Sequence, residues 1–377
     1  MDKLRLRIAA FGFRTIPPSE GAAGADKFAL ELFPRLVQKG HSVVAYNRRY
    51  PDVHVQIKNY KGVVIKTFKT TRRMGFDTLL HSVKCTWDII VHNTADIVHI
   101  QNGGNSIWAL PLRIFGKKVF ISQDGVDWKR EKWPWYGKLF LRLSAYLTSR
   151  LPNQVIFDNV IAKNFFEKKF KRKFEFIPFG SEVEPVEKDD AILEKFNLSK
   201  GGYYLFVGRF IPDKGLHYLI PAFVQSNSKR KLVLVGGSPN PSPYELEIQQ
   251  LTNENVIIAG YVYGDDVTRL MLNSYCYVQP SDVEGLSPVI LTVMGLGVPL
   301  IVSDIEENVY AVRDTAIKFK KTDIGSLTEK INYAEERYQE MMALAVKAKK
   351  RALQEFNWDS VTDEHIQLFS GKSLNKK

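Results

Sequence analysis

Cysteine is scarce in this sequence, and no long apolar run is uninterrupted. The 377 residues include two cysteines, Cys85 and Cys276, which are too few for a disulfide framework or a cysteine-rich zinc site and fit a reducing compartment. The longest apolar stretch, from Leu286 to Val302, is broken by proline, glycine and serine. It therefore predicts a buried helix followed by a strand, and not a bilayer helix. Residues 4–13 lack the long apolar core of a secretory leader and predict a strand instead.

Negative charge is scarce in the first half of the chain. Residues 1–180 carry 31 Lys and Arg against 14 Asp and Glu, whereas residues 181–377 carry 22 against 27. The net charge of +12 therefore comes entirely from the first half, which predicts two differently charged domains. So basic a domain fits nucleic acid, an anionic membrane or a phosphorylated substrate. The 45% hydrophobic and 25% charged residues are ordinary globular usage and exclude wholesale disorder.

Short apolar runs alternate with helical patterns along almost the whole chain. Polar and apolar residues do not alternate within these runs, which is typical of parallel strands that are covered on both faces of the sheet. We expect strands at residues 7–11, 42–46, 97–100, 118–121, 154–157, 203–207, 231–235, 256–259, 276–279 and 299–302. Helices are expected at residues 25–38 and 335–354. Repeated strand–helix units predict an α/β protein with two Rossmann-like, doubly wound domains that face each other across a cleft.

The first candidate binding segment lies between the first expected strand and helix. It reads Gly21-Ala22-Ala23-Gly24-Ala25-Asp26, and glycines there let backbone N–H groups approach an anion at a helix start. The glycine spacing does not fit the dinucleotide fingerprint. A simple tight turn is an equally good interpretation of this segment.

The second candidate follows the first strand of the second half. It contains Gly208, Arg209 and Lys214, with Gly215 directly after the lysine. A planar guanidinium and a flexible ammonium at the carboxyl end of a parallel strand favour a diphosphate ligand. The alternative is a solvated basic turn.

The third candidate also follows a strand and opens the apolar helix. Backbone N–H groups of Gly285, Leu286 and Ser287 are expected to point from the helix start towards an anion or hydroxyl. Glu284 would accept hydrogen bonds from sugar hydroxyls. Its alternative role is to cap the helix N-terminus, which a carboxylate does well.

Together these segments resemble family 4 retaining glycosyltransferases of the GT-B fold, over nearly the whole chain. The residues that carry the resemblance are Gly24, Asp26, Gly208, Arg209, Lys214, Glu284, Gly285, Leu286, Gly297, Val298, Pro299 and the segment Phe356-Asn357-Trp358. Residues 124–133 resemble more narrowly the rhamnosyltransferase-like branch of bacterial surface-polysaccharide enzymes. The resemblance implies an acceptor domain at residues 1–178, onto which residues 356–377 cross back, and a nucleotide-sugar donor domain at residues 179–355. The boundary near Gly180 is also where the charge changes sign.

The resemblance also implies roles for individual residues. Arg209 and Lys214 hold the donor diphosphate and stabilise the charge that grows on it as the glycosidic bond breaks. The implied donor-binding residues are Gly24, Gly208, Val262, Gly285, Leu286, Ser287 and Thr292, with Val262 near the base, and Glu284 and Asp124 complete the catalytic set. Such enzymes need no metal and no cofactor beyond the nucleotide sugar, whose UDP, dTDP or GDP type the sequence does not distinguish.

Two positions depart from the family pattern. Thr292 stands where the family places a second glutamate on the nucleotide ribose, and a hydroxyl is the weaker partner. Asp124 stands where many relatives carry a histidine that touches the donor sugar. We therefore keep two hypotheses: a retaining transferase that acts on a lipid-linked or oligosaccharide acceptor, and a non-catalytic GT-B partner subunit. Nucleic-acid binding is suggested only by charge and lacks its motifs.

Aromatic and basic residues are mixed between Trp128 and Arg150. The segment contains Trp128, Trp133, Trp135 and Tyr136 beside Lys129, Arg130, Lys132, Lys138 and Arg142. This mixture favours an anionic membrane surface or a lipid-diphosphate acceptor, and single-stranded nucleic acid is the alternative. We expect a cytoplasmic protein that is peripheral on the inner face of the cell membrane. His99 is expected to be a packed strand residue and not a catalyst.

Overall fold

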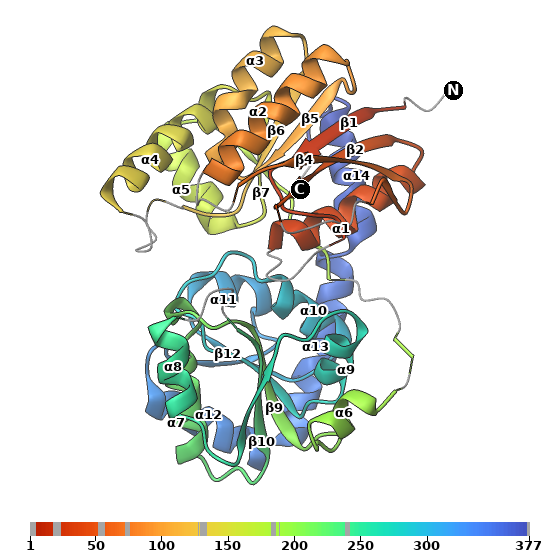
Figure 1. The fold of residues 1–377 in the computed structure, drawn as a ribbon. Coiled ribbons are helices and arrows are strands. Elements are labelled where there is room, and N and C mark those ends of the chain that lie inside the picture. Colours follow the sequence, from red (N-terminus) through yellow and green to blue (C-terminus); the bar gives the residue numbers. More distant parts are fainter. Residues whose placement is uncertain are drawn as a thin grey trace. The chain divides into compact units, whose positions relative to one another are not determined.

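The computed structural model describes residues 5–17, 24–51, 57–71, 76–126, 128, 134–181, 186–187, 189–237 and 242–374. The chain divides into two compact units (Figure 1). Unit 1 comprises Met1–Phe179 and Trp358–Lys377, and unit 2 comprises Gly180–Asn357. These borders lie within two residues of the positions expected from the sequence.

The described part of unit 1 contains an eight-stranded sheet with the order β3-β4-β2-β1-β5-β6-β7-β8. Its strands are β1 (Arg7–Phe11), β2 (Ser42–Arg49), β3 (Asn59–Tyr60), β4 (Val63–Lys69), β5 (Ile97–Gln101), β6 (Lys118–Gln123), β7 (Gln154–Phe157) and β8 (Glu175–Phe176). All neighbours are parallel except β3 and β4. The chain builds outward from β1 through β2 and then outward on the other side from β5. The order therefore reverses between β1 and β5, where doubly wound sheets bind ligands.

Helices cover both faces of the unit 1 sheet. They are α1 (Gly24–Gln38), α2 (Phe76–Val91), the 3-10 helix η1 (Gly103–Trp108), α3 (Ala109–Ile114), α4 (Trp135–Arg150), α5 (Val160–Phe170) and α14 (Trp358–Phe369). On one face, α2 and α3 bury Ile89 and Leu112 in the core. On the other face α14 packs beside α1, with the rings of Trp358 and Phe28 5.9 Å apart. The last helix of the chain thus completes the core of unit 1.

Unit 2 is a second doubly wound domain. Its described sheet has six parallel strands in the order β11-β10-β9-β12-β13-β14. They are β9 (Tyr203–Arg209), β10 (Lys231–Gly237), β11 (Val256–Gly260), β12 (Cys276–Gln279), β13 (Leu300–Ser303) and β14 (Ile317–Phe319). The strand order reverses between the neighbours β9 and β12. That position is the ligand-binding switch point of this sheet.

The helices of unit 2 enclose an apolar core built from both β9 and β12. They are α6 (Ala191–Lys195), the 3-10 helix η3 (Pro212–Lys214), α7 (Leu216–Gln225), α8 (Pro243–Gln250), α9 (Asp265–Leu272), α10 (Pro288–Leu296), α11 (Glu306–Val312), α12 (Ile324–Glu336) and α13 (Tyr338–Glu355).

The expected secondary structure is confirmed in its main parts. Each of the ten expected strands is present, the apolar stretch from Leu286 to Val302 forms α10 and most of β13, and both units are doubly wound. His99 is fully buried in β5, as expected of a packed residue. Over the described ranges, no helix combines the length and the hydropathy needed to cross a bilayer.

Candidate active site

The expected phosphate and sugar residues of unit 2 gather at its switch point. Gly208 and Arg209 end β9, Lys214 ends η3 directly after it, and Glu284 follows β12. Because β9 and β12 are parallel neighbours, their following loops lie at the same edge of the sheet. This edge is where an open α/β sheet holds its ligand.

The two loops are held in close contact. The backbone N–H of Asp282 donates to the carbonyl of Asp213 over 2.9 Å. Gly215 has φ +69°, and a Cβ placed there would lie 2.2 Å from the carbonyl oxygen of Pro280. Only glycine permits this approach, because any side chain would collide with backbone. The approach brings Lys214 to the loop after β12.

One carboxylate oxygen of Glu284 accepts three hydrogen bonds. Its Oε1 accepts from Lys214 Nζ at 2.5 Å, from Gln279 Nε2 at 2.6 Å and from Ser281 Oγ at 2.7 Å. The Glu284 side chain is 8% exposed, so these charge-assisted bonds form in a partly desolvated site. Among the described residues, the hydrogen bonds to Glu284 all end on Oε1. Its Oε2 is therefore the atom left to accept a bond from a ligand hydroxyl.

A second row of side chains orients this cluster, and the sequence did not indicate it. Tyr277 donates its hydroxyl to Gln279 Oε1 over 2.6 Å, which directs the Nε2 donors of Gln279 to Glu284 and Ser281. Burial and the nearby Glu284 carboxylate raise the pKa of Tyr277 above its ordinary value, so its hydroxyl remains a donor. The sequence feature that could have revealed Tyr277 and Gln279 is their position in β12, where Gln279 is the last residue. Nothing in the local sequence, however, distinguishes such residues from ordinary core side chains.

The start of α10 differs from the expectation. Ser287 is the N-cap residue and its side chain accepts from the N–H of Ile290, so the alternative that Glu284 caps this helix is wrong. Gly285 and Leu286 precede the helix. The expectation that three successive N–H groups belong to the helix start is therefore corrected to Ser287 at the cap, followed by Pro288, which has no N–H.

Thr292 uses its hydroxyl within α10. It is buried, and its Oγ1 donates to the carbonyl of Pro288 over 2.8 Å. A threonine that bonds to the turn before it is an ordinary helix feature. This bond occupies the donor that the hydroxyl would offer to a ribose.

Arg209 and Val262 lie at the same edge of the sheet. The Arg209 side chain is exposed and is thus accessible to a ligand. Val262 follows β11 and stands between Tyr261 and Tyr263, whose rings stack with centroids 5.8 Å apart. Gly208 lies opposite Gly236 of β10 in the sheet register. Because neither residue has a side chain, the backbone is accessible at this part of the sheet edge.

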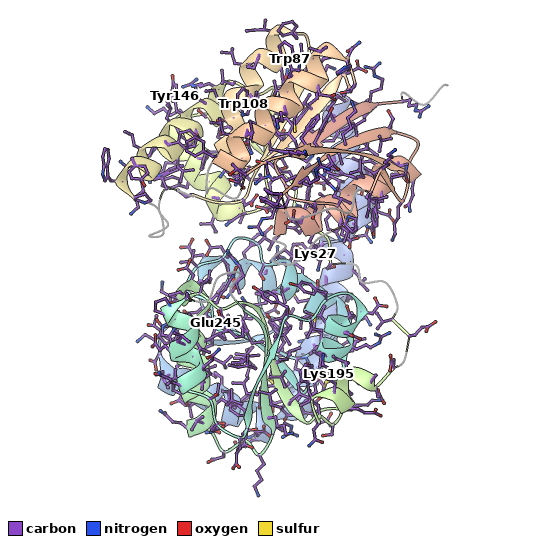
Figure 2. All side chains as sticks on the ribbon, viewed as in Figure 1. Lys27, Trp87, Trp108, Tyr146, Lys195 and Glu245 are labelled. Atoms are coloured by element: carbon purple, nitrogen blue, oxygen red, sulfur yellow. The ribbon has the colours of Figure 1, made fainter. Side chains whose placement is uncertain are left out.

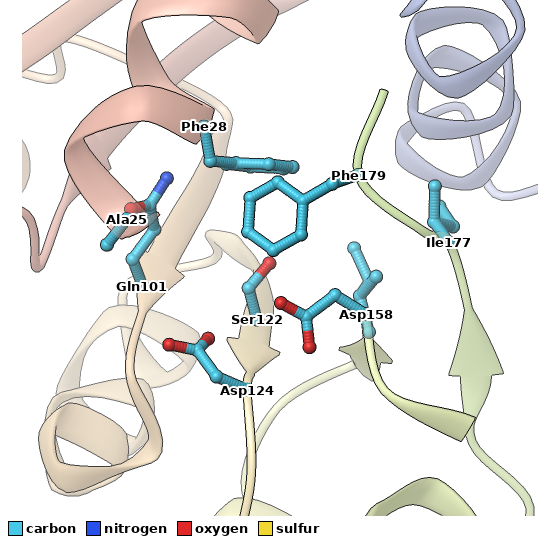
Figure 3. Close-up of a pocket in the computed structure, with 9 residues that line it drawn as sticks. Ala25, Phe28, Gln101, Ser122, Asp124, Asp158, Ile177 and Phe179 are labelled. Carbon is cyan, nitrogen blue, oxygen red and sulfur yellow. The ribbon is translucent and has the colours of Figure 1, made fainter. Parts of the chain in front are cut away.

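Unit 1 has a pocket at the corresponding edge of its own sheet. It is lined by Ala25, Phe28, Gln101, Ser122, Asp124, Ile156, Asp158, Ile177 and Phe179 (Figure 3). The polar members lie within the last two residues of β5 or β6 or directly follow β6 or β7, close to the switch point beside β1. The pocket encloses about 20 Å³, enough for one water-sized group. The structure therefore places Asp124 in a pocket, together with Gln101 and Asp158, which the sequence did not indicate.

The carboxylate of Asp26, in the first turn of α1, has a structural role. Asp26 is buried and accepts from the backbone N–H of Arg14 at 2.7 Å and of Thr15 at 3.3 Å. It thereby fixes the segment that follows β1. Gly24 begins α1, whereas Gly21, Ala22 and Ala23 lie outside the described residues. Among the described side chains, no three His, Cys, Asp or Glu residues converge as a metal site.

The basic aromatic segment divides into a buried and an exposed part. Trp128 is 7% exposed and packs in the core with Phe166, so the expectation that it faces a membrane is wrong. Lys129, Arg130, Lys132 and Trp133 lie outside the described residues. On α4 the exposed apolar side chains follow helical spacing and are Trp135, Tyr136, Leu139, Phe140, Leu143 and Tyr146.

Comparison with protein families assigns the second unit. Residues 188–351 match the family described as glycosyl transferases group 1. They form a glycosyl transferases group 1 domain. Residues 90–182, which include all the polar pocket residues of unit 1, match a domain of unknown function, DUF1972. The group 1 domain thus contains Arg209, Lys214, Glu284 and Thr292.

The curated relatives described next are named as glycosyltransferases. The chain is 26% identical over 218 residues to O-antigen chain mannosyltransferase C of Escherichia coli, which is 56% of this chain and 58% of that protein. It is 27% identical over 186 residues to the N,N'-diacetylbacillosaminyl-diphospho-undecaprenol alpha-1,3-N-acetylgalactosaminyltransferase of Campylobacter jejuni, with 48% of each covered. The chain thus spans about half the length of these relatives.

Solved structures place both units in one fold. Sucrose-phosphate synthase of Thermosynechococcus elongatus superposes with a TM-score of 0.83 at 19% identity, covering 97% of this chain and 99% of that one. Anabaena HepE, solved with UDP and glucose, gives 0.78 at 16% identity, covering 97% and 100%. At these identities the likeness concerns the fold, which is GT-B. The narrower rhamnosyltransferase-like branch stays a prediction.

Proposed function

We propose that the protein is a retaining glycosyltransferase that moves a sugar from a nucleotide-diphosphate donor to a glycan acceptor in bacterial surface-polysaccharide synthesis. The observation that carries this proposal is the group of Arg209, Lys214 and Glu284 at the β9–β12 switch point of the group 1 domain. Two cations suit the donor diphosphate, and the carboxylate suits a sugar hydroxyl beside it. The relatives whose names describe mannosyl and N-acetylgalactosaminyl transfer support the reaction class.

The proposed chemistry depends on electrostatic stabilisation of the leaving group. As the bond between the sugar C1 and the diphosphate oxygen breaks, Arg209 and Lys214 stabilise the negative charge that develops. The acceptor oxygen bonds to C1 on the face that the diphosphate leaves, and the departing diphosphate takes the acceptor proton. Glu284 keeps Lys214 in place through Oε1 and offers Oε2 to the donor sugar. The anomeric configuration is retained without a nucleophile from the protein.

Transfer by this route uses no metal and no cofactor besides the nucleotide sugar. Mg²⁺ commonly neutralises a leaving diphosphate in other phosphate-binding enzymes. Here a guanidinium and an ammonium supply the two positive charges. The proposal therefore expects activity to be the same with and without a chelator.

The proposed acceptor is a lipid-linked saccharide, reached from an anionic membrane surface. The exposed stripe of α4 combines Trp135, Leu139 and Leu143 with the exposed cation Arg142, as helices at a membrane interface do. The 3-10 helix η1 contacts both α2 and α4, and Figure 2 labels Trp87, Trp108 and Tyr146 on these three elements. Trp87 on α2 is exposed as well. The Campylobacter relative is named for an undecaprenol-linked acceptor.

A non-catalytic GT-B partner subunit is the second candidate. It is favoured by Thr292, which stands where the resembling family has a ribose-binding glutamate and whose hydroxyl donates to its own helix. Such a subunit would bind no nucleotide. An active transferase would bind at least one of UDP, dTDP and GDP.

The experiment that tests the function combines nucleotide binding with a donor screen. Calorimetry with UDP, dTDP and GDP identifies the base, and product mass then identifies the sugar transferred to a lipid-linked acceptor. We expect Arg209→Ala and Lys214→Ala each to lower transfer by at least about 100-fold, since each removes a charge that stabilises the transition state.

The matched control is Lys229→Ala. Lys229 is exposed and precedes β10 at the amino edge of the same sheet, so its loss should leave transfer unchanged. Near-normal turnover by Lys214→Ala would contradict the proposed catalytic role of Lys214. Failure of the intact chain to bind any of the three nucleotides would favour the partner-subunit hypothesis.

A further inference from the structure

The pocket of unit 1 contains polar atoms without a partner. Gln101 is 2% exposed, and within the described residues neither its Nε2 nor its Oε1 has a hydrogen-bond partner. Oδ1 of Asp158 is likewise buried and unpaired there. Buried polar atoms are costly to leave unpaired, so they mark a place where a ligand or an ordered water supplies the missing bonds.

The unpaired atoms face the same small space. Figure 3 shows the side chains of Gln101, Asp124 and Asp158 directed into the pocket from three adjacent strand ends. An amide presents one donor group and one acceptor, and a sugar hydroxyl, which can both donate and accept, complements either of them. The enclosed 20 Å³ admits a group of hydroxyl size and not a whole sugar ring.

The carboxyl groups exclude an anionic ligand. Burial, and then the neighbouring Asp124 carboxylate, raise the pKa of Asp158 well above its ordinary value, which favours the protonated form and with it a hydrogen-bond donor. Asp124 adds acceptor oxygens. Nothing in the lining is cationic, and a phosphate entering here would meet carboxyl groups without a countercharge. An uncharged hydroxyl fits both polar partners.

The remaining walls are apolar and would border the edge of the ring that carries the bound hydroxyl. Phe28 and Phe179 meet edge to face with ring centroids 5.3 Å apart, and Ile177 extends this apolar wall. Apolar and aromatic walls with a few convergent polar groups are typical of small-molecule sites. The location at the carboxyl edge beside the β1–β5 switch point is independent support.

We propose that this pocket is a hydroxyl-binding subsite for the acceptor sugar, in which Gln101, Asp124 and Asp158 surround one hydroxyl group at the edge of the bound ring. The inference rests on the proposed function in taking the sugar to be the acceptor's. It assigns Gln101 and Asp158 as acceptor-specificity residues of unit 1, separate from the diphosphate residues of the group 1 domain.

The test uses the full chain and free monosaccharides as probes. Saturation-transfer NMR measures binding of mannose, galactose, glucose, rhamnose and N-acetylglucosamine in the absence of nucleotide. We expect at least one to bind, Gln101→Leu to weaken that binding at least tenfold, and Asp158→Leu to do the same. Asp158→Asn should keep it within about threefold, because an amide retains a donor where the protonated acid had one.

Folding and nucleotide binding are measured on the same variants. Gln101→Leu removes unpaired polar atoms and should not lower the unfolding midpoint; Gln101→Met replaces it if the leucine variant does not fold. Calorimetric binding of the nucleotide found for the intact chain should be the same in all variants. Loss of nucleotide binding with normal monosaccharide binding would contradict the proposed function alone.

Three outcomes would overturn the subsite. In the first, no monosaccharide binds the intact chain. In the second, Gln101→Leu binds as well as the intact chain, so the pocket holds an ordered water only. In the third, Gln101→Leu weakens binding of the nucleotide sugar but not of the nucleoside diphosphate or of any free monosaccharide, which assigns the pocket to the donor sugar.

Discussion

At the scale of single residues, the proposed mechanism gives the two carboxylate oxygens of Glu284 different functions. Its Oε1 accepts from Lys214, Gln279 and Ser281, which fixes both the carboxylate and the lysine. A lysine is flexible and strongly hydrated, so a partner that holds it before the donor arrives reduces the ordering that binding requires. In the proposed site, the diphosphate would meet an ammonium group that is already in position.

Thr292 provides a prediction at this scale. Because its hydroxyl donates to Pro288 O inside α10, we expect Thr292→Val to change nucleotide affinity by less than about twofold. The free energy of unfolding should fall by about 1 kcal/mol, the usual value of one hydrogen bond. Calorimetry and denaturant unfolding measure the two quantities. A tenfold loss of affinity would instead place the hydroxyl on the ribose.

The residues that the sequence could predict are those with a local signal. Arg209, Lys214 and Glu284 each lie in a glycine-containing segment directly after an apolar run, and such segments are visible without knowing the sheet order. The ion pair between Lys214 and Glu284 joins residues 70 positions apart and requires β9 and β12 to be neighbours. Gln101 and Asp158 are single polar residues at strand ends, so only the strand order reveals that they share a pocket.

At the scale of elements, the strands that could be predicted from the sequence are mainly those whose side chains are buried on both faces of the sheet. β5, β12 and β13 are buried along their whole length and stand out as continuous apolar runs. β4 alternates buried with exposed or half-buried residues near the sheet edge, and β14 has three residues, so neither has such a run. The strands that the sequence did not indicate are β3, β4 and β8 in unit 1 and β14 in unit 2, whereas β11, at the other edge of the unit 2 sheet, was expected.

Helix α4 carries the prediction at this scale. We expect the double variant Leu139→Glu/Phe140→Glu to bind phosphatidylglycerol vesicles at least about tenfold more weakly than the intact chain, because it removes two exposed apolar side chains and adds two negative charges. Vesicle co-sedimentation measures the change.

The matched control for α4 is Val346→Glu/Leu353→Glu. Both residues are exposed apolar side chains on α13 in unit 2, so their replacement alters charge and apolar surface equally. Vesicle binding of this control should stay close to that of the intact chain, apart from a small general charge effect. Equal losses in the two double variants would show that α4 is not the docking element.

At the scale of the whole molecule, the tryptophans report on one unit. All six lie within the residues of unit 1, whereas the proposed nucleotide site lies in unit 2. Tryptophan fluorescence therefore follows the unfolding of unit 1 alone. A shift of that signal by a nucleoside diphosphate would measure how strongly the two units are coupled.

Buried histidines make unit 1 sensitive to acid. Burial, with His365 nearby, lowers the pKa of His99 to about 3, and burial, with Arg48 nearby, lowers the pKa of His81 to about 3. Unfolded histidines bind protons below about pH 6.5, so the unfolded state binds more protons between that value and about pH 3. Stability is therefore lost as the pH falls through this window, by about 2 kcal/mol for each histidine at about pH 5.

Urea unfolding followed by tryptophan fluorescence at about pH 8 and about pH 5 measures this loss. His99→Gln should remove roughly half of the difference that the two histidines cause. His92→Gln is the control, since His92 is exposed at the end of α2. An unchanged pH dependence in His99→Gln would contradict the assignment.

The return of α14 to unit 1 has a consequence for synthesis on the ribosome. Trp358 and Phe369 pack against Phe28 and Phe120, yet they are translated after the 178 residues of unit 2. At about 5–20 residues per second the nascent unit 1 waits roughly 9–36 s without its closing helix. During that interval the apolar surface that α14 covers beside α1 is exposed, which is a surface for chaperones to shield. Unit 2 is therefore complete in sequence before unit 1, although unit 1 contains the N-terminus.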